Sequence, residues 1–359
     1  MRFALVGLGY ATRFLHLPAI ASVPNATIVG GSDPSVEARS SLPFPTFATR
    51  DELLRAVEAD VVVIASPPHD HADSCIAALE ANAHVICEKP FVSSLEEADR
   101  VIDTERRTGF TVSVNQEFRF MPIFAALQRA VHDQSIGRAV FAQCTQFMDL
   151  APWDEKVAWR ADMSDRSLFE GGVHLVDLLH WCMGGPPSRV TGYASSGLDR
   201  SKKADAIHLV TLEWPDGQVA QITINRLSKI GTRYVDIRVD GERSSVVASY
   251  GGRAQVRVGL MRSERPGVKI DFGLEGEAWA ENGHHRKSLA RNKKNSAPLA
   301  TGELYRQVVE SIAAGRPSPV PAVQARSTLR TILASYESAR TGATVELSKG
   351  LAKGLAKEQ

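Results

Sequence analysis

Short hydrophobic runs alternate with amphipathic segments along the first 120 residues. The runs are continuous and rich in Val and Ile, which is typical of strands that are covered on both faces. Strands are expected at 3–7, 26–32, 60–66, 84–87 and 110–115, and helices at 12–22, 35–41, 50–57, 69–82 and 94–107. This alternation predicts βαβ units and a parallel sheet with right-handed crossovers.

The pattern changes after residue 135. Segment 234–241, YVDIRVDG, alternates apolar and polar residues, as in a strand with one buried face. Hairpin turns are indicated at 214–218 and 240–242. A mostly antiparallel sheet is expected from strands at 139–148, 188–195, 207–214, 218–225, 234–240 and 244–248. Helices are expected over the stretch 167–181 and at 301–314 and 322–340. The basic stretch 281–298 predicts a solvated loop, with an anion-binding flap as the alternative.

Composition limits the classes of function. The chain has 359 residues, 43% of them hydrophobic, and a net charge of +1. This suffices for two hydrophobic cores, and the balanced charge indicates neither nucleic acid nor an anionic membrane as a partner. No signal peptide is expected, because the chain begins with the strand pattern MRFALVG. No membrane span is expected either, because no apolar run approaches roughly 18 residues. The cysteines form no CxxC pair, so reduced thiols and a cytoplasmic location are expected.

The segment ALVGLGYATRFLHLPAI follows the first strand and opens the first helix. Gly7 and Gly9 match the first two positions of GxGxxG, where glycine allows a tight turn and close approach of a pyrophosphate. Thr12 takes the third position, so slightly less close helix–strand packing is expected. The helix N-terminus formed by Tyr10, Ala11 and Thr12 would face the pyrophosphate. A Rossmann dinucleotide-binding domain is therefore predicted.

Asp33 follows the second strand in GGSDPS. An acid at this place binds the ribose hydroxyls of a dinucleotide and repels a 2′-phosphate, so NAD is preferred over NADP. The alternative is that Asp33 merely begins a turn with Pro34.

Further landmarks follow the third and fourth strands. Ser66 and Pro67 end one strand, His71 lies in the next segment, and the next strand ends in EKP, Glu88–Lys89–Pro90. With VNQEFRFMP (114–122), AWR (158–160) and ASYESARTGATVEL (334–347), these segments resemble the Gfo/Idh/MocA family of glucose–fructose oxidoreductase, inositol dehydrogenase and rhizopine-catabolism proteins. The resemblance extends along nearly the whole chain.

The patterns and the resemblance together predict an α/β protein with two domains. Residues 1–120 would form the Rossmann domain, and residues 121–347 a C-terminal α+β domain for substrate binding and oligomerisation, with a large mostly antiparallel sheet. Residues 348–359 are expected to fray. The resemblance implies an NAD-dependent oxidoreductase acting on a sugar, inositol or related polyol. It also implies a homodimer or homotetramer assembled through the open face of the large sheet.

The stretch SLFEGGVHLVDLLHW (167–181) puts Glu170, His174 and Asp177 on one face of an expected helix. Family members usually carry Asp, any residue, Gly, any residue and His at this place, so Gly172 and His174 match while Glu170 replaces Asp. The resemblance therefore implies Lys89, Glu170 and His174 as the reaction centre. The longer acid leaves three roles open for Glu170: orienting His174, binding a substrate hydroxyl, or neither.

The implied reaction is oxidation of a secondary alcohol, in which the hydroxyl proton needs a base. His174 is the first choice because an imidazole titrates near neutral pH. Lys89 would donate a hydrogen bond to the developing oxygen charge, or relay the proton if burial lowers its pKa. A cis peptide bond before Pro90, which the resemblance implies, would turn the lysine toward the substrate.

Several residues have plainer alternatives. His174 alone would be read as a satisfied core histidine, Lys89 as a solvated lysine, and Asp177 as a local cap. His71 and Asn115 are expected near the nicotinamide, whereas Trp159 and Arg160 are expected to touch cofactor or substrate. No metal is expected, because the histidines of the stretch 69–71 lack a third ligand.

Two other functions remain open. Some relatives retain NAD and use transient oxidation to cleave a glycosidic bond, so product would appear without NADH. Others have lost catalysis and act as dinucleotide-binding regulators, which would be expected to lose the lysine or the histidine.

Overall fold

The computed structural model divides the chain into two compact units. The first comprises Met1–Met121 and Ala297–Leu333, and the second comprises Pro122–Ser296 and Ala334–Gln359. The structure describes residues 1–149, 163–198, 204–229, 234–251, 253–258, 268–273, 275–283 and 285–347. The expected frayed tail, 348–359, lies outside the described residues.

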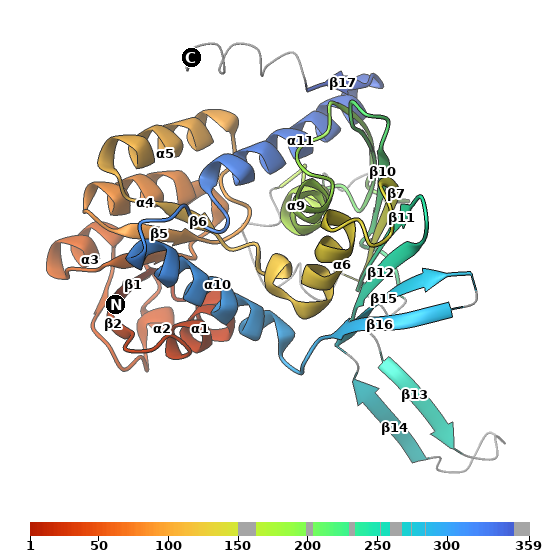
Figure 1. The fold of residues 1–359 in the computed structure, drawn as a ribbon. Helices are drawn as coiled ribbons and strands as arrows, with labels where there is room; N and C mark the ends of the chain where they lie inside the picture. Colours follow the sequence, from red (N-terminus) through yellow and green to blue (C-terminus); the bar gives the residue numbers. More distant parts are fainter. Residues whose placement is uncertain are drawn as a thin grey trace. The chain divides into compact units, whose positions relative to one another are not determined.

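A six-stranded parallel sheet forms the centre of the first unit (Figure 1). Its order is β3-β2-β1-β4-β5-β6, which is the order of a dinucleotide-binding Rossmann sheet. The strands are β1 (Arg2–Val6), β2 (Thr27–Ser32), β3 (Thr46–Phe47), β4 (Val61–Ile64), β5 (His84–Cys87) and β6 (Val112–Val114). All four residues of β4 are fully buried, as the continuous Val/Ile run predicts. The predicted parallel sheet is thus confirmed, with β3 as an additional short edge strand.

Helices connect these strands and begin where local caps favour them. Thr49 forms a capping box with Glu52, and Ser94 accepts the backbone N–H of Glu97. The helical segments are η1 (Thr12–His16), α1 (Leu17–Ala21), α2 (Val36–Arg39), α3 (Arg50–Ala56), α4 (Pro68–Glu80), α5 (Leu95–Thr108) and η2 (Glu117–Phe120). These short crossovers bring the carboxyl ends of the parallel strands to one edge of the sheet.

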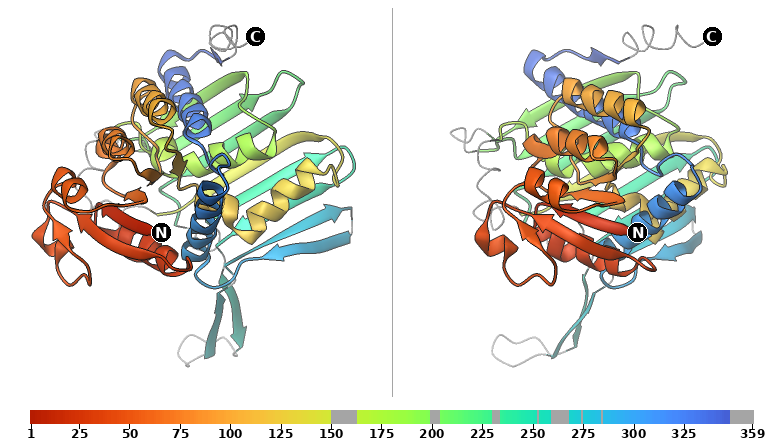
Figure 2. Two further views of the ribbon diagram at one scale, coloured as in Figure 1. Left: turned by 60° about the vertical axis from the view of Figure 1, so that its left-hand side comes forward. Right: turned by 90° about the vertical axis from the view of Figure 1, so that its left-hand side faces the viewer.

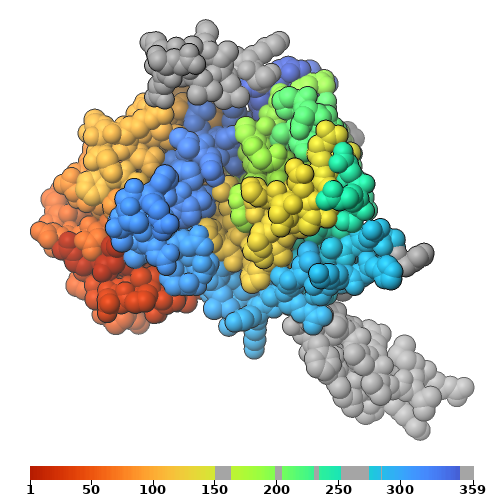
Figure 3. Space-filling view, in the orientation of Figure 1, coloured from red at the N-terminus to blue at the C-terminus, as the bar shows by residue number. Residues whose placement is uncertain are grey.

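The first unit also contains α10 (Ser296–Ala313) from its second residue and the first part of α11 (Ala322–Thr341). Tyr305 of α10 is fully buried and stacks on Phe3 of β1, with ring centroids 5.9 Å apart. Figure 3 shows the blue surface of α10 beside the red and orange surface of the N-terminal segment. The sequence division at residue 120 is contiguous, whereas the units of the structure are interleaved.

A nine-stranded sheet forms the second unit, in the order β16-β15-β12-β11-β7-β10-β9-β8-β17. Only β7 and β10 pair in parallel among its named neighbours, so the predicted mostly antiparallel sheet is confirmed. The strands are β7 (Ala139–Phe147), β8 (Arg189–Ser195), β9 (Ile207–Glu213), β10 (Val219–Asn225), β11 (Val235–Gly241), β12 (Ser245–Tyr250), β15 (Gly276–Asn282), β16 (His285–Arg291) and β17 (Val345–Glu346). A separate ribbon pairs β13 (Arg253–Val258) with β14 (Val268–Gly273).

Helices α6 (Pro122–His132) and α9 (Val173–Cys182) lie on one face of this sheet (Figure 2). Buried residues alternate with exposed ones along β9 and β10, so the same face is apolar. The basic stretch expected to be a loop instead contains edge strand β16, whose Arg286 and Arg291 pair with Glu277 of β15. Within the described part of the chain, no helix is long and apolar enough to cross a membrane.

Candidate functional site

The turn after β1 has the geometry that the glycine motif predicts. Gly7 has φ +89°, and a Cβ added there would lie 2.5 Å from the carbonyl oxygen of Ala65. A Cβ added at Gly9 would meet nothing within 4 Å, so the backbone borders open space. Thr12, at the third motif position, donates from Oγ1 to the carbonyl oxygen of Gly7 at 2.6 Å. This hydrogen bond closes the turn, which explains a threonine in place of glycine at the third motif position.

Asp33 ties the end of β2 to the glycine turn. Its Oδ2 accepts the backbone N–H of Leu8 at 2.8 Å, and its Oδ1 accepts that of Ser35 at 2.8 Å. The hydrogen bond from Ser35 forms a local turn, which is the alternative role named above for Asp33. The hydrogen bond from Leu8 brings the carboxylate to the glycine motif. Each oxygen keeps a second lone pair for a ribose hydroxyl.

His71 joins the ends of β4 and β5. The ring is 1% exposed; Nε2 lies 2.8 Å from the carbonyl oxygen of Ser66, and Nδ1 lies 2.9 Å from that of Pro90. Carbonyl oxygens only accept, so the tautomer of the ring decides which of its two nitrogens donates a hydrogen bond. The predicted cis peptide bond before Pro90 is present. Pro67 caps α4 directly after Ser66.

Glu88, immediately before Lys89, is the centre of a buried polar network. Its Oε1 accepts Asn115 Nδ2 at 2.6 Å and lies 3.1 Å from His16 Nε2. His16 Nδ1 in turn lies 2.8 Å from the Tyr305 hydroxyl. Burial would raise the pKa of the Glu88 carboxyl, but His16, Lys89 and Asn115 outweigh it and lower the pKa to about 2. The half-buried Lys89 donates its backbone N–H to Glu88 Oε2 at 3.1 Å.

The candidates of the first unit therefore share one location. Each follows the carboxyl end of a strand of the parallel sheet, where such folds bind ligands. They are Gly7, Gly9, Tyr10, Ala11 and Thr12 after β1, Asp33 after β2, Ser66, Pro67 and His71 after β4, Glu88, Lys89 and Pro90 after β5, and Asn115 after β6.

These residues fit a dinucleotide. Gly9 borders open space, and the buried oxygens Ser66 Oγ and Asn115 Oδ1 have no hydrogen-bond partner within the described residues. Buried polar atoms without partners are costly, so both oxygens favour a polar ligand group at this edge. Across the described ranges, no group of three or more His, Cys, Asp or Glu side chains could hold a metal ion.

In the second unit, the expected single helix is divided. Ser167–Gly171 forms the π-turn η3, which carries Glu170, and α9 then carries His174 and Asp177. Exposure is 7% for Glu170, 4% for His174 and 1% for Asp177. A Cβ at Gly172 would lie 2.4 Å from Ile224 Cδ1, so the glycine allows the turn to approach β10 closely. Single-turn π-helices are frequent at functional sites.

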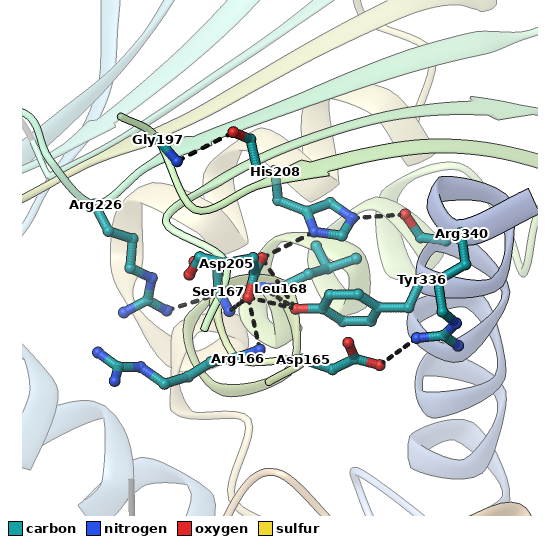
Figure 4. Close-up of polar contacts among 12 residues, drawn as sticks. Asp165, Arg166, Ser167, Leu168, Gly197, Asp205, His208, Arg226, Tyr336 and Arg340 are labelled. Atoms are coloured by element: carbon teal, nitrogen blue, oxygen red, sulfur yellow. Dashed lines mark hydrogen bonds and ion pairs between the residues drawn. The ribbon is translucent and has the colours of Figure 1, made fainter. Parts of the chain in front are cut away.

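A second buried network fixes the start of this π-turn (Figure 4). Asp205 Oδ1 accepts the backbone N–H groups of Arg166 and Ser167 at 2.7 and 2.8 Å, and Oδ2 lies 3.1 Å from His208 Nδ1. The Tyr336 hydroxyl lies 3.3 Å from the same carboxylate and accepts the N–H of Leu168. Burial would raise the pKa of the Asp205 carboxyl, but the hydrogen bonds of His208, Ser167 and Arg166 outweigh it and lower the pKa.

Some residues of these networks could not be identified from the sequence. His16 belongs to no recognisable motif, yet it is fully buried beside Glu88. Asp205 precedes β9, and His208 lies near its start. Neither belongs to a recognisable motif, and their partners lie near residues 167 and 336. Trp159 and Arg160 lie outside the described residues.

Residues 1–116 match the family model described as "Oxidoreductase family, NAD-binding Rossmann fold", and residues 128–347 match "Oxidoreductase family, C-terminal alpha/beta domain". The chain belongs to the Gfo/Idh/MocA oxidoreductase family. The resemblance and the oxidoreductase class expected from the sequence are thereby confirmed.

Two curated dehydrogenases illustrate the sequence similarity. Glucose-6-phosphate 3-dehydrogenase of Bacillus subtilis is 28% identical over 187 residues, covering 50% of this chain and 52% of that protein. Inositol 2-dehydrogenase 4 of Saccharopolyspora erythraea is 28% identical over 307 residues, covering 78% of this chain and 85% of that protein. The chain therefore spans about half of the first relative and most of the second.

Solved structures share the fold at lower sequence identity. An oxidoreductase from Agrobacterium radiobacter in complex with NAD+, L-tartaric acid and magnesium has a TM-score of 0.81 and 16% identity, covering 97% of this chain and 99% of that chain. The WlbA dehydrogenase from Bordetella pertussis in complex with NADH and UDP-GlcNAcA has a TM-score of 0.77 and 21% identity, covering 96% of this chain and 98% of that chain.

Proposed function

We propose that this protein transfers a hydride between a secondary alcohol of a sugar, inositol or related polyol and the nicotinamide of NAD. The observation that carries the proposal is the set of polar and glycine residues at the carboxyl edge of the 3-2-1-4-5-6 sheet, with Lys89 among them. The inositol and glucose-phosphate dehydrogenases among the relatives support a sugar-like substrate.

The chain's residues divide the work of binding the dinucleotide. The glycine turn would hold the pyrophosphate at the helix N-terminus, and Asp33 would bind the ribose hydroxyls. The carboxylate of Asp33 disfavours a 2′-phosphate, which supports NAD over NADP. Ser66 and Asn115 would accept hydrogen bonds from the nicotinamide end, and the bound nicotinamide supplies the hydride acceptor.

Lys89 and His174 would carry the proton chemistry. His174 would take the hydroxyl proton at a ring nitrogen, and Lys89 Nζ would donate a hydrogen bond to the substrate oxygen as its charge develops. Glu88 accepts the Lys89 backbone N–H and so helps to fix the lysine's position. Glu170 would orient His174 or bind a substrate hydroxyl.

The test is a screen of neutral and acidic sugars and cyclitols with NAD and NADP, in which reduced cofactor is followed. His174→Ala is expected to lower turnover about 100- to 10,000-fold while NAD affinity stays nearly unchanged. His132→Ala, in α6, and Lys287→Ala, in β16, are the matched controls for His174→Ala and Lys89→Ala. Unchanged turnover in both site variants would contradict the proposed roles. Release of sugar from an added glycoside without reduced cofactor would instead indicate glycoside cleavage.

We also propose that the protein is a homodimer or homotetramer assembled through the large sheet. Tyr193 of β8 and Leu209 of β9 are register partners and are 59% and 41% exposed. An exposed cross-strand pair of large apolar side chains supports a protein interface.

The four free, buried cysteines support the cytoplasmic location expected from the sequence.

A further inference from the structure

Arg226 lies against the π-turn that carries Glu170. It follows β10, is 6% exposed, and donates from Nη2 to the carbonyl oxygen of Ser167 at 2.9 Å. A Cβ added at Gly171 would lie 2.2 Å from the same Nη2, so the guanidinium touches the residue next to Glu170. Figure 4 shows the guanidinium groups of Arg166 and Arg226 on the same side of the turn, opposite Tyr336.

The guanidinium of Arg226 uses few of its donors. It has five N–H groups, and Ser167 is its one hydrogen-bond acceptor within the residues that the structure describes. Its Nε is buried and has no partner there. Burial lowers the pKa of Arg226, and the nearby Arg166 also lowers it, while Glu170 opposes both. A buried guanidinium with unused donors is costly, which favours an acceptor that binds there.

Neither nearby carboxylate supplies that acceptor. Asp205 is engaged by backbone N–H groups and by His208, and Glu170 Oε2 lies 3.9 Å from Arg166 Nε. No ion pair joins Arg226 to a carboxylate in the described part of the chain. The charge of Glu170 therefore reduces the cost of burying Arg226 without using its N–H groups.

Gln146 presents an unused acceptor beside the unused donors. Its Nε2 donates to the Tyr234 hydroxyl at 2.9 Å, whereas its Oε1 is buried without a partner in the described residues. The same Cβ position at Gly171 that meets Arg226 lies 3.0 Å from this Oε1. A group that offers both an anionic oxygen and a hydroxyl would satisfy both side chains.

We propose that Arg226 and Gln146 form a recognition site for an anionic polyol, so that the substrate carries a carboxylate or phosphate as well as hydroxyl groups. The anion would accept from the Arg226 guanidinium, and a neighbouring hydroxyl would donate to Gln146 Oε1. This inference rests on the proposed function for its setting, but it concerns binding and is separable from hydride transfer.

The first experiment compares matched compounds on the unmodified protein. Glucuronate and glucose 6-phosphate are the acidic probes, and glucose and myo-inositol are the neutral ones. Thermal shift reports binding, and reduced cofactor reports turnover. The proposal expects at least one acidic probe to raise the melting temperature and to exceed the neutral probes in kcat/KM; the two acids distinguish carboxylate from phosphate.

The second experiment assigns the effect to the residue. Arg226→Gln is expected to raise KM for the acidic probe about 10- to 100-fold and to leave KM for neutral probes nearly unchanged. Arg226→Lys, which keeps the charge, is expected to restore part of the affinity. Arg238→Gln, a 49% exposed arginine of β11, is the control and is expected to change neither value.

The outcomes separate the two proposals. Turnover of neutral probes without binding of either acid overturns the anion site and leaves the oxidoreductase function intact. Arg226-dependent binding of an acid without any cofactor reduction keeps the anion site and contradicts the proposed function. If Arg226→Gln raises KM equally for acidic and neutral probes, and Arg226→Lys does not restore it, Arg226 only supports the π-turn. That result overturns the proposal.

Discussion

At the scale of single residues, the two glycines of the first turn meet different physical demands. Gly7 adopts φ +89° and packs against the backbone of Ala65, so both its conformation and its surroundings exclude a side chain. Gly9 has no neighbour within 4 Å of a potential Cβ, so the fold itself tolerates a side chain there. Its place in the motif is therefore best explained by a ligand that approaches the backbone.

The pair Gly7→Ala and Gly9→Ala should separate folding from binding. Gly7→Ala is expected to lower the free energy of unfolding by about 1–3 kcal/mol, because it adds backbone strain and a clash. Gly9→Ala is expected to leave that free energy nearly unchanged and to weaken NAD binding. Urea unfolding and NAD titration by fluorescence measure the two quantities. Full NAD affinity in Gly9→Ala would show that the dinucleotide does not approach this backbone.

Residues next to predicted strands could be found from the sequence, whereas residues held by distant partners could not. Asp33 and Lys89 each follow a recognisable strand, and the parallel sheet then fixes their edge. His16 and Arg226 acquire their meaning from Tyr305 and Ser167, which are remote in the chain. No local periodicity encodes such pairs, because they form only when the chain is folded.

At the scale of elements, burial pattern decided what the sequence could predict. The strand β4 was predictable because all its residues are apolar and buried. The strand β16 was missed because it is an edge strand with exposed charged residues, held by Glu277 of its neighbour. The π-turn η3 was missed because Gly171 and Gly172 allow close packing that a simple helical repeat does not show.

The network around Glu88 joins the residues that follow β5 and β6 with η1 and α10. The pH dependence of its contribution to stability is testable. The lowered pKa means that the unfolded chain binds the proton more tightly, so the stabilisation exists above pH 4.5 and disappears as the pH falls toward 2. The shift corresponds to about 3 kcal/mol. The free energy of unfolding of the wild type should therefore exceed that of Glu88→Gln at pH 7, with the difference shrinking below pH 4.5.

Glu105→Gln is the control for this measurement. Burial raises the pKa of Glu105, so the folded chain binds its proton more tightly and its contribution to stability grows as the pH falls. The difference in free energy of unfolding between the wild type and Glu105→Gln should therefore change with pH in the opposite direction to the difference for Glu88→Gln. A Glu88→Gln difference that stays constant from pH 7 to pH 3 would contradict an ionised Glu88 in the network.

At the scale of the whole molecule, the order of elements along the chain and their grouping in space differ. Both sheets could be predicted, because each has its own repeat: continuous apolar runs in one and alternation in the other. The grouping of α10 with the first unit could not be predicted, because its contacts with Phe3 and His16 join residues at opposite ends of the chain. A contiguous division at residue 120 is the natural expectation from patterns alone.

Assembly of several copies is the last expectation that depends on the whole molecule. Leu209 and Tyr193 expose large apolar side chains on neighbouring strands of the nine-stranded sheet, and a charge at this position would be buried in an interface between copies. Leu209→Arg is therefore expected to lower the mass measured by light scattering toward that of a single chain. Val36→Arg, at a 73% exposed position of α2, is the control and should keep the wild-type mass. A wild type that is already monomeric, or an unchanged mass in Leu209→Arg, would contradict assembly through this face.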